Sequence, residues 1–182
     1  MAINLVRIRD CQEHTELAVR LLTEYRDFLY SETTVTPETH RSFIASLPKE
    51  DYMWVVERDG SLCGLVSAYH FDSKNRKCEW GRFMVDEDFR GVGSVVEYMV
   101  IDFVFQKLGI HKLLCEVLED NGSVFRMHEK FGFRIEGTLR DHIFKAGAFR
   151  NIVYMGMIDS EWSACRERFY NLFQNKIGKV EC

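Results

Sequence analysis

Residues 85–96 read Val-Asp-Glu-Asp-Phe-Arg-Gly-Val-Gly-Ser-Val-Val, and this stretch decides the fold. A strand-like run over 78–85 leads into it. A helical pattern follows from about Ser94 to Leu108, with apolar residues at helical spacing. A strand, a glycine turn and a helix together place unpaired backbone N–H groups and the positive end of a helix dipole around a concave backbone. We therefore expect this turn to bind a phosphate group.

The glycines alone do not identify the ligand. A Walker loop needs Gly-x4-Gly-Lys-Ser/Thr, but no Lys follows here, and a dinucleotide fingerprint needs a third glycine where Val96 stands. About thirty residues further on, the chain reads Glu-x-x-Glu-Asp-Asn over 116–121 and His-Glu-Lys-Phe-Gly-Phe over 128–133. The glycine turn and these two motifs, in this order and spacing, resemble the acetyl-CoA-binding core of the GNAT N-acetyltransferase family.

The length and composition indicate one domain. With 182 residues, 46% hydrophobic residues and two prolines, the chain is long enough for a full core and shows no linker. Residues 1–182 are therefore predicted to form a single N-acetyltransferase domain. Residues 160–182 are expected to form an amphipathic helical tail, which either folds back on the core or packs in a homodimer.

Charge and cysteine usage restrict the partners and the location. The formal net charge of −4 argues against nucleic acid as a partner. No apolar run approaches the roughly 18 residues of a membrane span, and the N-terminus lacks the apolar segment of a signal peptide. The six cysteines form no C-x-x-C pair, and the histidines are too scattered for a metal site. We expect a cytoplasmic protein without a metal and without a membrane partner.

The remaining elements follow from local signals. Helices are expected after Asp10, from Pro37 and over 121–131. The expected strands cover 3–9, 52–57, 62–71, 111–118, 133–144 and 149–158. The order β-α-α-β-β-β-α-β-α-β-β predicts an α+β fold, an α/β/α sandwich with a mixed, mostly antiparallel sheet flanked by helices. The GNAT resemblance implies the same order.

The resemblance also assigns residues to acetyl-CoA, the expected co-substrate. Backbone donors for its pyrophosphate come from Arg90, Gly91, Val92, Gly93 and Ser94, although Val95 stands where the family pattern has a small residue. The strand before the turn is expected to pair with the pantetheine arm through Met84 and Val85. Asn121 matches the asparagine that binds the pantetheine from the start of the next helix.

Transfer of an acetyl group to an amine needs two proton movements, because the ammonium group must lose a proton and the departing thiolate must be stabilised or protonated. Glu79 lies where family members often place the base. The alternative is an exposed strand carboxylate that pairs with Lys77 or Arg82. His128 stands at the position where the family has the tyrosine that acts as general acid, so it is predicted to be the general acid. The alternative is a histidine on the helix surface without a catalytic role. Both residues are predicted to be catalytic.

The acceptor is expected to be a small-molecule amine. The segment 78–81 together with the glycine turn resembles acetyltransferases of the pseudaminic-acid pathway, which implies a nucleotide-linked amino sugar acetylated on its 4-amino group. The residues expected to bind it are Arg26, Tyr30, Trp54, Tyr69 and Arg82.

Three alternatives stay open. Residues 136–140 and 149–151 also resemble spermidine acetyltransferases and ribosomal-protein N-terminal acetyltransferases. A polyamine needs a pocket lined by carboxylates, which Glu24, Asp27 and Glu32 could supply. The departures at Val95 and His128 also fit a catalytically silent module that binds acetyl-CoA as a sensor.

Overall fold

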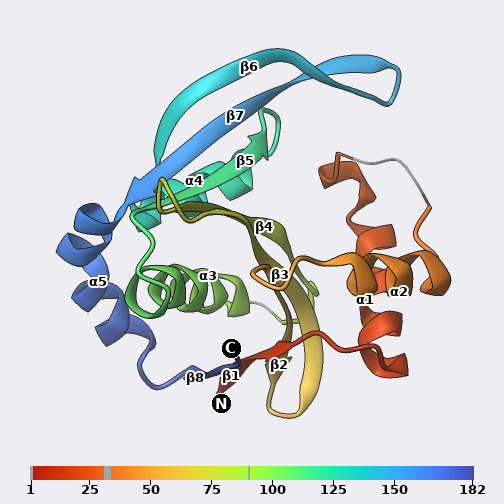
Figure 1. Ribbon diagram of the computed structural model, residues 1–182, viewed down its shortest axis with the longest axis horizontal. Helices are drawn as coiled ribbons and strands as arrows, with labels where there is room; N and C mark the ends of the chain where they lie inside the picture. The colour runs from red at the N-terminus through yellow and green to blue at the C-terminus, as the bar shows by residue number, and fades with distance from the viewer. Residues whose placement is uncertain (1, 31–33, 90) are drawn as a thin grey trace.

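The computed structural model describes residues 2–30, 34–89 and 91–182. Eight strands form one sheet in the order β6-β7-β5-β4-β3-β2-β1-β8 (Figure 1). The strands are β1 (Ile3–Arg7), β2 (Tyr52–Arg58), β3 (Ser61–Asp72), β4 (Lys77–Val85), β5 (Lys112–Leu118), β6 (Arg134–Lys145), β7 (Ala148–Ile158) and β8 (Ile177–Val180). The helices are α1 (Gln12–Glu24), η1 (Arg26–Phe28), α2 (Pro37–Ser46), α3 (Val92–Asp102), η2 (Phe103–Lys107), α4 (Gly122–Phe131) and α5 (Asp159–Phe173).

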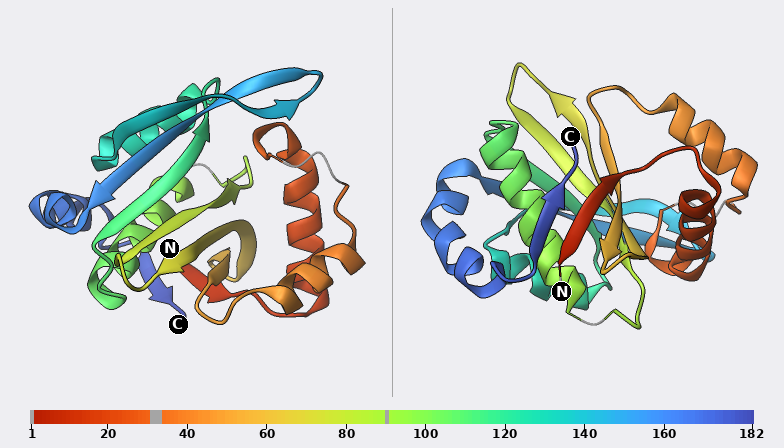
Figure 2. Two further views of the ribbon diagram at one scale, coloured as in Figure 1. Left: turned by 45° about the horizontal axis from the view of Figure 1, so that its top comes forward. Right: turned by 90° about the horizontal axis from the view of Figure 1, so that it is seen from below.

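The two faces of the sheet are covered by different helices. Helices α1 and α2 pack on one face, and α3 and α5 lie on the other (Figure 2, right). Side chains of β2 alternate between these faces, as the period of a strand requires. Met53 and Val55 join the core under α1, whereas Trp54 and Val56 join the larger core under α3. The predicted α+β sandwich with a mixed, mostly antiparallel sheet is confirmed.

The C-terminal tail packs on its own chain. Trp162 in α5 is fully buried, and β8 pairs in parallel with β1. The expected helix thus ends at Phe173, and the last residues form an edge strand instead. A Cβ at Gly178 would lie 2.5 Å from the carbonyl oxygen of Ile3, so this close approach of the two strands depends on glycine.

The sheet separates in its middle, and this separation creates the site. Strands β4 and β5 pair in parallel only from Lys77 to Glu79 on β4 and from Lys112 to Leu114 on β5. Beyond these residues the two strands diverge (Figure 2, left). β4 also carries one extra residue opposite β3 between Gly81 and Met84, a β-bulge where Arg82 has φ +48°. The gap between β4 and β5 and the bulge both lie beside the glycine turn.

Within the described residues, no helix combines the length and the apolar character that a membrane crossing requires.

Candidate active site

A cavity of about 230 Å³ lies in the gap between β4 and β5. Its walls are residues 80–85 of β4, residues 115–118 of β5, the start of α4, and Tyr25, Phe28, Leu29 and Tyr30 from the segment after α1. His128 lies at the α4 wall. We call this space the donor cavity, because it holds the segments predicted to bind the pantetheine arm.

The glycine turn has the geometry of an anion cradle. Gly91 is the N-cap of α3 with φ +80°, and the helix begins at Val92. The N–H of Val92 donates to the carbonyl oxygen of Phe89 at 3.2 Å, so an anion here would be bound by the N–H groups that follow it in the first turn of α3. Val95 is fully buried in the core under α3. The side chain of Val95 therefore packs into the core, and it does not fill the space at the glycine turn where an anion would bind. Arg90 lies outside the described residues.

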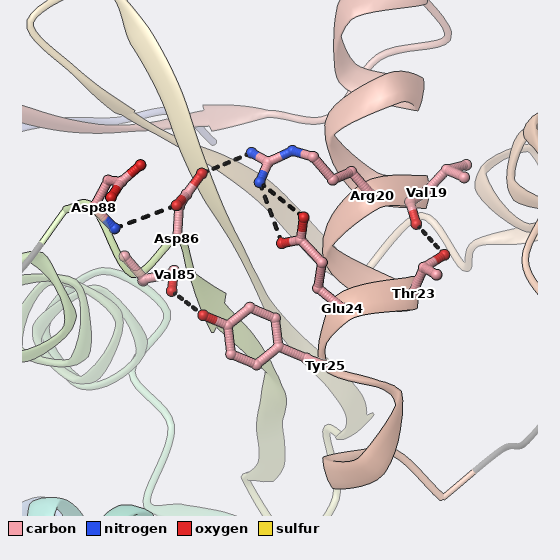
Figure 3. A network of polar contacts seen from close by, with 8 residues as sticks. All are labelled: Val19, Arg20, Thr23, Glu24, Tyr25, Val85, Asp86 and Asp88. Carbon is pink, nitrogen blue, oxygen red and sulfur yellow. Dashed lines mark hydrogen bonds and ion pairs between the residues drawn. The ribbon is translucent and has the colours of Figure 1, made fainter.

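The end of β4 is fixed to α1 by polar contacts (Figure 3). The Tyr25 hydroxyl donates to the carbonyl oxygen of Val85 at 2.7 Å. Arg20 forms an ion pair with Asp86 at 2.8 Å and a second one with Glu24 at 3.2 Å. These contacts hold the strand exit that leads into the glycine turn.

Two other predicted donor-side residues have roles in the fold. The side chain of Met84 is 4% exposed and packs in the core under α1, so only its backbone is free to face the gap. Asn121 is the N-cap of α4, and its Oδ1 accepts from the backbone N–H of Val124 at 3.4 Å. Asn121 also lines the donor cavity, so contact with pantetheine stays a prediction.

A second cavity of about 510 Å³, here called the acceptor cavity, adjoins the first across Gly81 and Arg82. It is lined by Glu79, Glu116, Tyr30, Tyr69, His70, Gly81, Arg82 and the apolar side chains Leu22, Phe28, Leu29 and Val35. Carboxylates beside aromatic and apolar side chains suit an amine carried on a partly apolar molecule.

Glu79 points into the acceptor cavity and pairs with neither Lys77 nor Arg82. Its Oε2 lies 3.2 Å from Nδ1 of His70, and its side chain is 22% exposed. A carboxylate next to a histidine at the mouth of the cavity can receive a proton and pass it to solvent.

Glu116 is a site residue that the sequence reasoning did not select. It is the first residue of the Glu-x-x-Glu-Asp-Asn motif, which was the signal that could have found it. The hydroxyl of Tyr154 donates to Glu116 across the β5–β7 pair. Burial, the charge of Glu116 and a hydrogen bond to it raise the pKa of Tyr30, while the hydrogen bond to Glu116 is the main cause that raises the pKa of Tyr154.

His128 is buried, which excludes the alternative of a histidine on the helix surface. Its side chain is 5% exposed, and Nδ1 lies 2.8 Å from Oε1 of Glu97, whose side chain is fully buried in α3. The ring of Trp80 packs edge-on against it, with the centroids 5.0 Å apart. Burial raises the pKa of Glu97, and the hydrogen bond and charge of His128 act against that shift.

Arg82 borders both cavities from the bulge of β4. Its guanidinium lies 4.3 Å from the centroid of the Tyr69 ring and 5.2 Å from that of Phe43. Its Nη1 is buried and has no hydrogen-bond partner among the described residues. Burial is the main cause that raises the pKa of Tyr69 to about 12, and Arg82 opposes this shift.

Two predicted acceptor residues lie elsewhere. The prediction for Trp54 is wrong: the side chain is fully buried under α3, and its Nε1 donates to the carbonyl oxygen of Glu181 at 2.7 Å. The alternation of β2 turns Trp54 away from the cleft. The exposed Arg26 lies on η1 and lines neither cavity, whereas Tyr30, Tyr69 and Arg82 do line the acceptor cavity.

Two of the three carboxylates proposed for a polyamine, Glu24 and Asp27, line neither cavity. Glu24 pairs with Arg20 on the surface of α1, and Asp27 is exposed on η1. Glu32 lies outside the described residues. Across residues 2–30, 34–89 and 91–182, no cluster of three or more histidine, cysteine or acidic side chains is placed to hold a metal ion.

The chain is similar to known acetyltransferases in sequence and in structure. The model of an acetyltransferase (GNAT) domain matches residues 5–134. A Bacillus subtilis protein provisionally named a ribosomal N-acetyltransferase, YdaF, is 26% identical over 89% of this chain and 93% of its own length. Spermidine N(1)-acetyltransferase of Escherichia coli K12 is 27% identical over 61% of this chain and 60% of its own length.

Two further acetyltransferases match this chain at lower sequence identity. The acetyltransferase PseH of Campylobacter jejuni is 22% identical over 71% of this chain and 76% of its own length. The crystal structure of the spermidine N-acetyltransferase from Vibrio cholerae in complex with CoA and spermine superimposes with a TM-score of 0.77 over 88% of this chain and 98% of that chain, at 19% identity.

Proposed function

Since the chain belongs to the GNAT family of N-acetyltransferases, we propose that it transfers the acetyl group of acetyl-CoA to a primary amine with a carbonyl group close by, as in the N-terminal residue of a polypeptide. The acetyl donor would lie along β4 in the donor cavity, with its pyrophosphate at the start of α3. The amine would enter through the acceptor cavity. Glu79 would take the proton that the ammonium group must lose before it attacks.

The composition of the acceptor cavity supports this acceptor. Glu79 and Glu116 offer negative charge to an ammonium group, while Arg82 offers a buried N–H without a partner. A buried cationic donor without a partner is costly, and a carbonyl or carboxylate oxygen of the acceptor would satisfy it. An N-terminal residue carries both groups within a few bonds.

Other acceptors fit this cavity less well. A polyamine is cationic at several positions, so the guanidinium of Arg82 would repel it. A nucleotide-linked sugar carries a diphosphate, which needs several cationic side chains, and of the two predicted for it only Arg82 lines the cavity. The amino-sugar prediction therefore gives way to the N-terminal amine, with spermidine as the second candidate.

The test is release of CoA from acetyl-CoA with three amines: a short peptide with a free N-terminus, spermidine and a nucleotide-linked 4-amino sugar. We expect the peptide to have the highest kcat/KM. Arg82→Gln should lower kcat/KM for the peptide roughly tenfold or more, as loss of one charge-assisted hydrogen bond predicts, and should leave spermidine unchanged or improved. Arg26→Gln is the matched control. Preferred turnover of spermidine, or equal losses in both Arg variants, contradicts the proposed acceptor.

A further inference from the structure

Glu97 is an ionisable residue in the most apolar helix of the chain. Its neighbours in α3 are the buried residues Val95, Val96, Tyr98 and Met99, and Glu97 itself is 0% exposed. Burial of a carboxyl group in such surroundings is unfavourable, which its raised pKa also shows. Only one of its oxygens has a partner, because Oε2 is buried without a hydrogen bond among the described residues. A pair that only stabilised the fold would be expected to satisfy both oxygens.

The partner of Glu97 faces the donor cavity. His128 uses Nδ1 for the 2.8 Å contact with Oε1 of Glu97, and no hydrogen bond of its Nε2 is formed within the described residues. Trp80 and Phe133 pack on the imidazole with ring centroids at 5.0 and 5.5 Å, so the ring has little freedom to turn. A carboxylate that accepts from Nδ1–H fixes the tautomer of a histidine and leaves Nε2 for chemistry.

We propose that Glu97 is a positioning residue: it holds His128 so that Nε2 faces the sulfur of bound acetyl-CoA. This inference rests on the proposed function. The amine nitrogen forms a bond to the carbonyl carbon, and the C–S bond then breaks with its electron pair on sulfur. The imidazolium Nε2–H gives its proton to that sulfur, so that CoA leaves as the neutral thiol. Glu79 takes the proton that the ammonium group loses before attack and passes it to solvent, and then takes the second proton, which the nitrogen loses as the amide forms. His128 regains a proton from solvent in the next cycle.

The surroundings of His128 leave Glu97 as its one close charged partner among the described residues. From α3 it is faced by Glu97, from β4 by the uncharged Trp80, and from the connection between α4 and β6 by the apolar Phe133. Burial keeps the pKa of the Cys115 thiol of β5 well above its ordinary value. The other charged or titratable side chains that line the donor cavity are Glu116, Arg82, Tyr25 and Tyr30, and none of them makes a hydrogen bond or an ion pair with His128 among the described residues. The pH dependence of proton delivery should therefore follow the Glu97–His128 pair.

Three variants test the pair through kinetics: Glu97→Gln, His128→Phe and the double variant. Glu97→Gln keeps the size and one oxygen acceptor but removes the charge, so kcat should fall roughly 10- to 100-fold while the KM for acetyl-CoA stays within about twofold. The double variant should be no slower than His128→Phe alone, because Glu97 acts only through His128. Multiplied losses, or a raised KM with unchanged kcat, would overturn the proposal.

His128→Tyr provides a second readout that a structural role would not move. Tyrosine ordinarily titrates near ~10 and histidine near ~6.5, so the alkaline limb of the kcat–pH profile should move to higher pH in this variant. Glu97→Gln made in the His128→Tyr background should leave kcat unchanged within about twofold, since the phenol has no Nδ1–H to orient. An alkaline limb at the same pH in both proteins would exclude His128 as the proton donor.

Nitrogen NMR of the histidine-labelled protein tests the geometry without turnover. At low pH both ring nitrogens of His128 should carry a proton, and at high pH Nε2 should lose its proton while Nδ1 keeps its own. Addition of CoA should shift Nε2 and leave Nδ1 in place. Glu97→Gln should change the tautomer ratio. If the wild-type protein acetylates no amine, the proposed function fails, and this spectrum alone decides whether the pair is built as described. An Nε2 chemical shift that does not change when CoA is added contradicts the inference.

Discussion

Lys145 ties the tip of the β6–β7 hairpin to the connection between α1 and α2, and Lys145→Met tests how much this tether contributes. Lys145 is 6% exposed, and its Nζ donates to the carbonyl oxygen of Arg26 at 2.7 Å and to that of Leu29. Hydrogen bonds from a charged group contribute about 1.5–3 kcal/mol each, so two contribute about 3–6 kcal/mol. Burial of the ammonium group costs several kcal/mol in return. We expect a net loss of about 2 kcal/mol, because methionine keeps most of the packing.

The loss should be local, since both carbonyls belong to a surface connection and not to the core. About 2 kcal/mol corresponds to roughly a 30-fold change in a local opening equilibrium. Hydrogen exchange should therefore accelerate roughly 30-fold at residues 143–145 and 148–150, with α3 unchanged. Lys74→Met, at an exposed turn, is the control. Acceleration below about threefold at the tip, or equal acceleration in α3, would refute the reasoning.

Three further predictions address the donor turn, the core and the titration of buried groups. Gly91→Ala should weaken binding of CoA about fivefold or more in calorimetry, because the free turn relaxes away from φ +80° and its return to the binding conformation costs about 1–2 kcal/mol. Gly93→Ala, where a Cβ meets only an ordinary contact, should bind CoA nearly as wild type. Trp54→Ala should lower the free energy of unfolding by about 3–5 kcal/mol in urea titrations, yet leave the acceptor KM of the folded enzyme unchanged. Burial raises the pKa of the Cys78 thiol from 9.0 to about 12, so the folded state keeps a proton that the unfolded chain loses. The free energy of unfolding should therefore be unaffected by this thiol below pH 9 and should fall toward pH 12, less steeply in Cys78→Ala. An equal dependence on pH in both proteins would count against this assignment.

The sequence predicts the strands, helices and glycine turn well because local patterns determine them. The end of the strand that leads into the turn and the motif at 116–121 line one cavity, as the resemblance implies. Their chemistry depends on backbone shape and on a few neighbouring residues, which a linear motif records.

The errors concern which face of the sheet a side chain meets. Trp54 and Met53 are neighbours in the sequence but belong to different cores, and alternation alone does not tell which face holds the cleft. Glu97 was missed for a related reason, because a single acidic residue in an apolar helix is normally predicted to lie on the surface. Only packing of α3 against α4 shows that it lies beside His128. The edge strand β8 was missed because its pairing with β1 links the two ends of the chain.

The brief contact between β4 and β5 has a consequence for cooperativity. Three residues on each strand join the sheet of β1–β4 and β8 to that of β5–β7, so the fold is nearly two subdomains sharing helices α3 and α5. Under the proposed function, the pantetheine arm of acetyl-CoA would lie in this gap and make backbone-like contacts that the two strands do not make with each other. Bound acetyl-CoA would then take the place of a missing strand and join the two parts of the sheet into one cooperative unit.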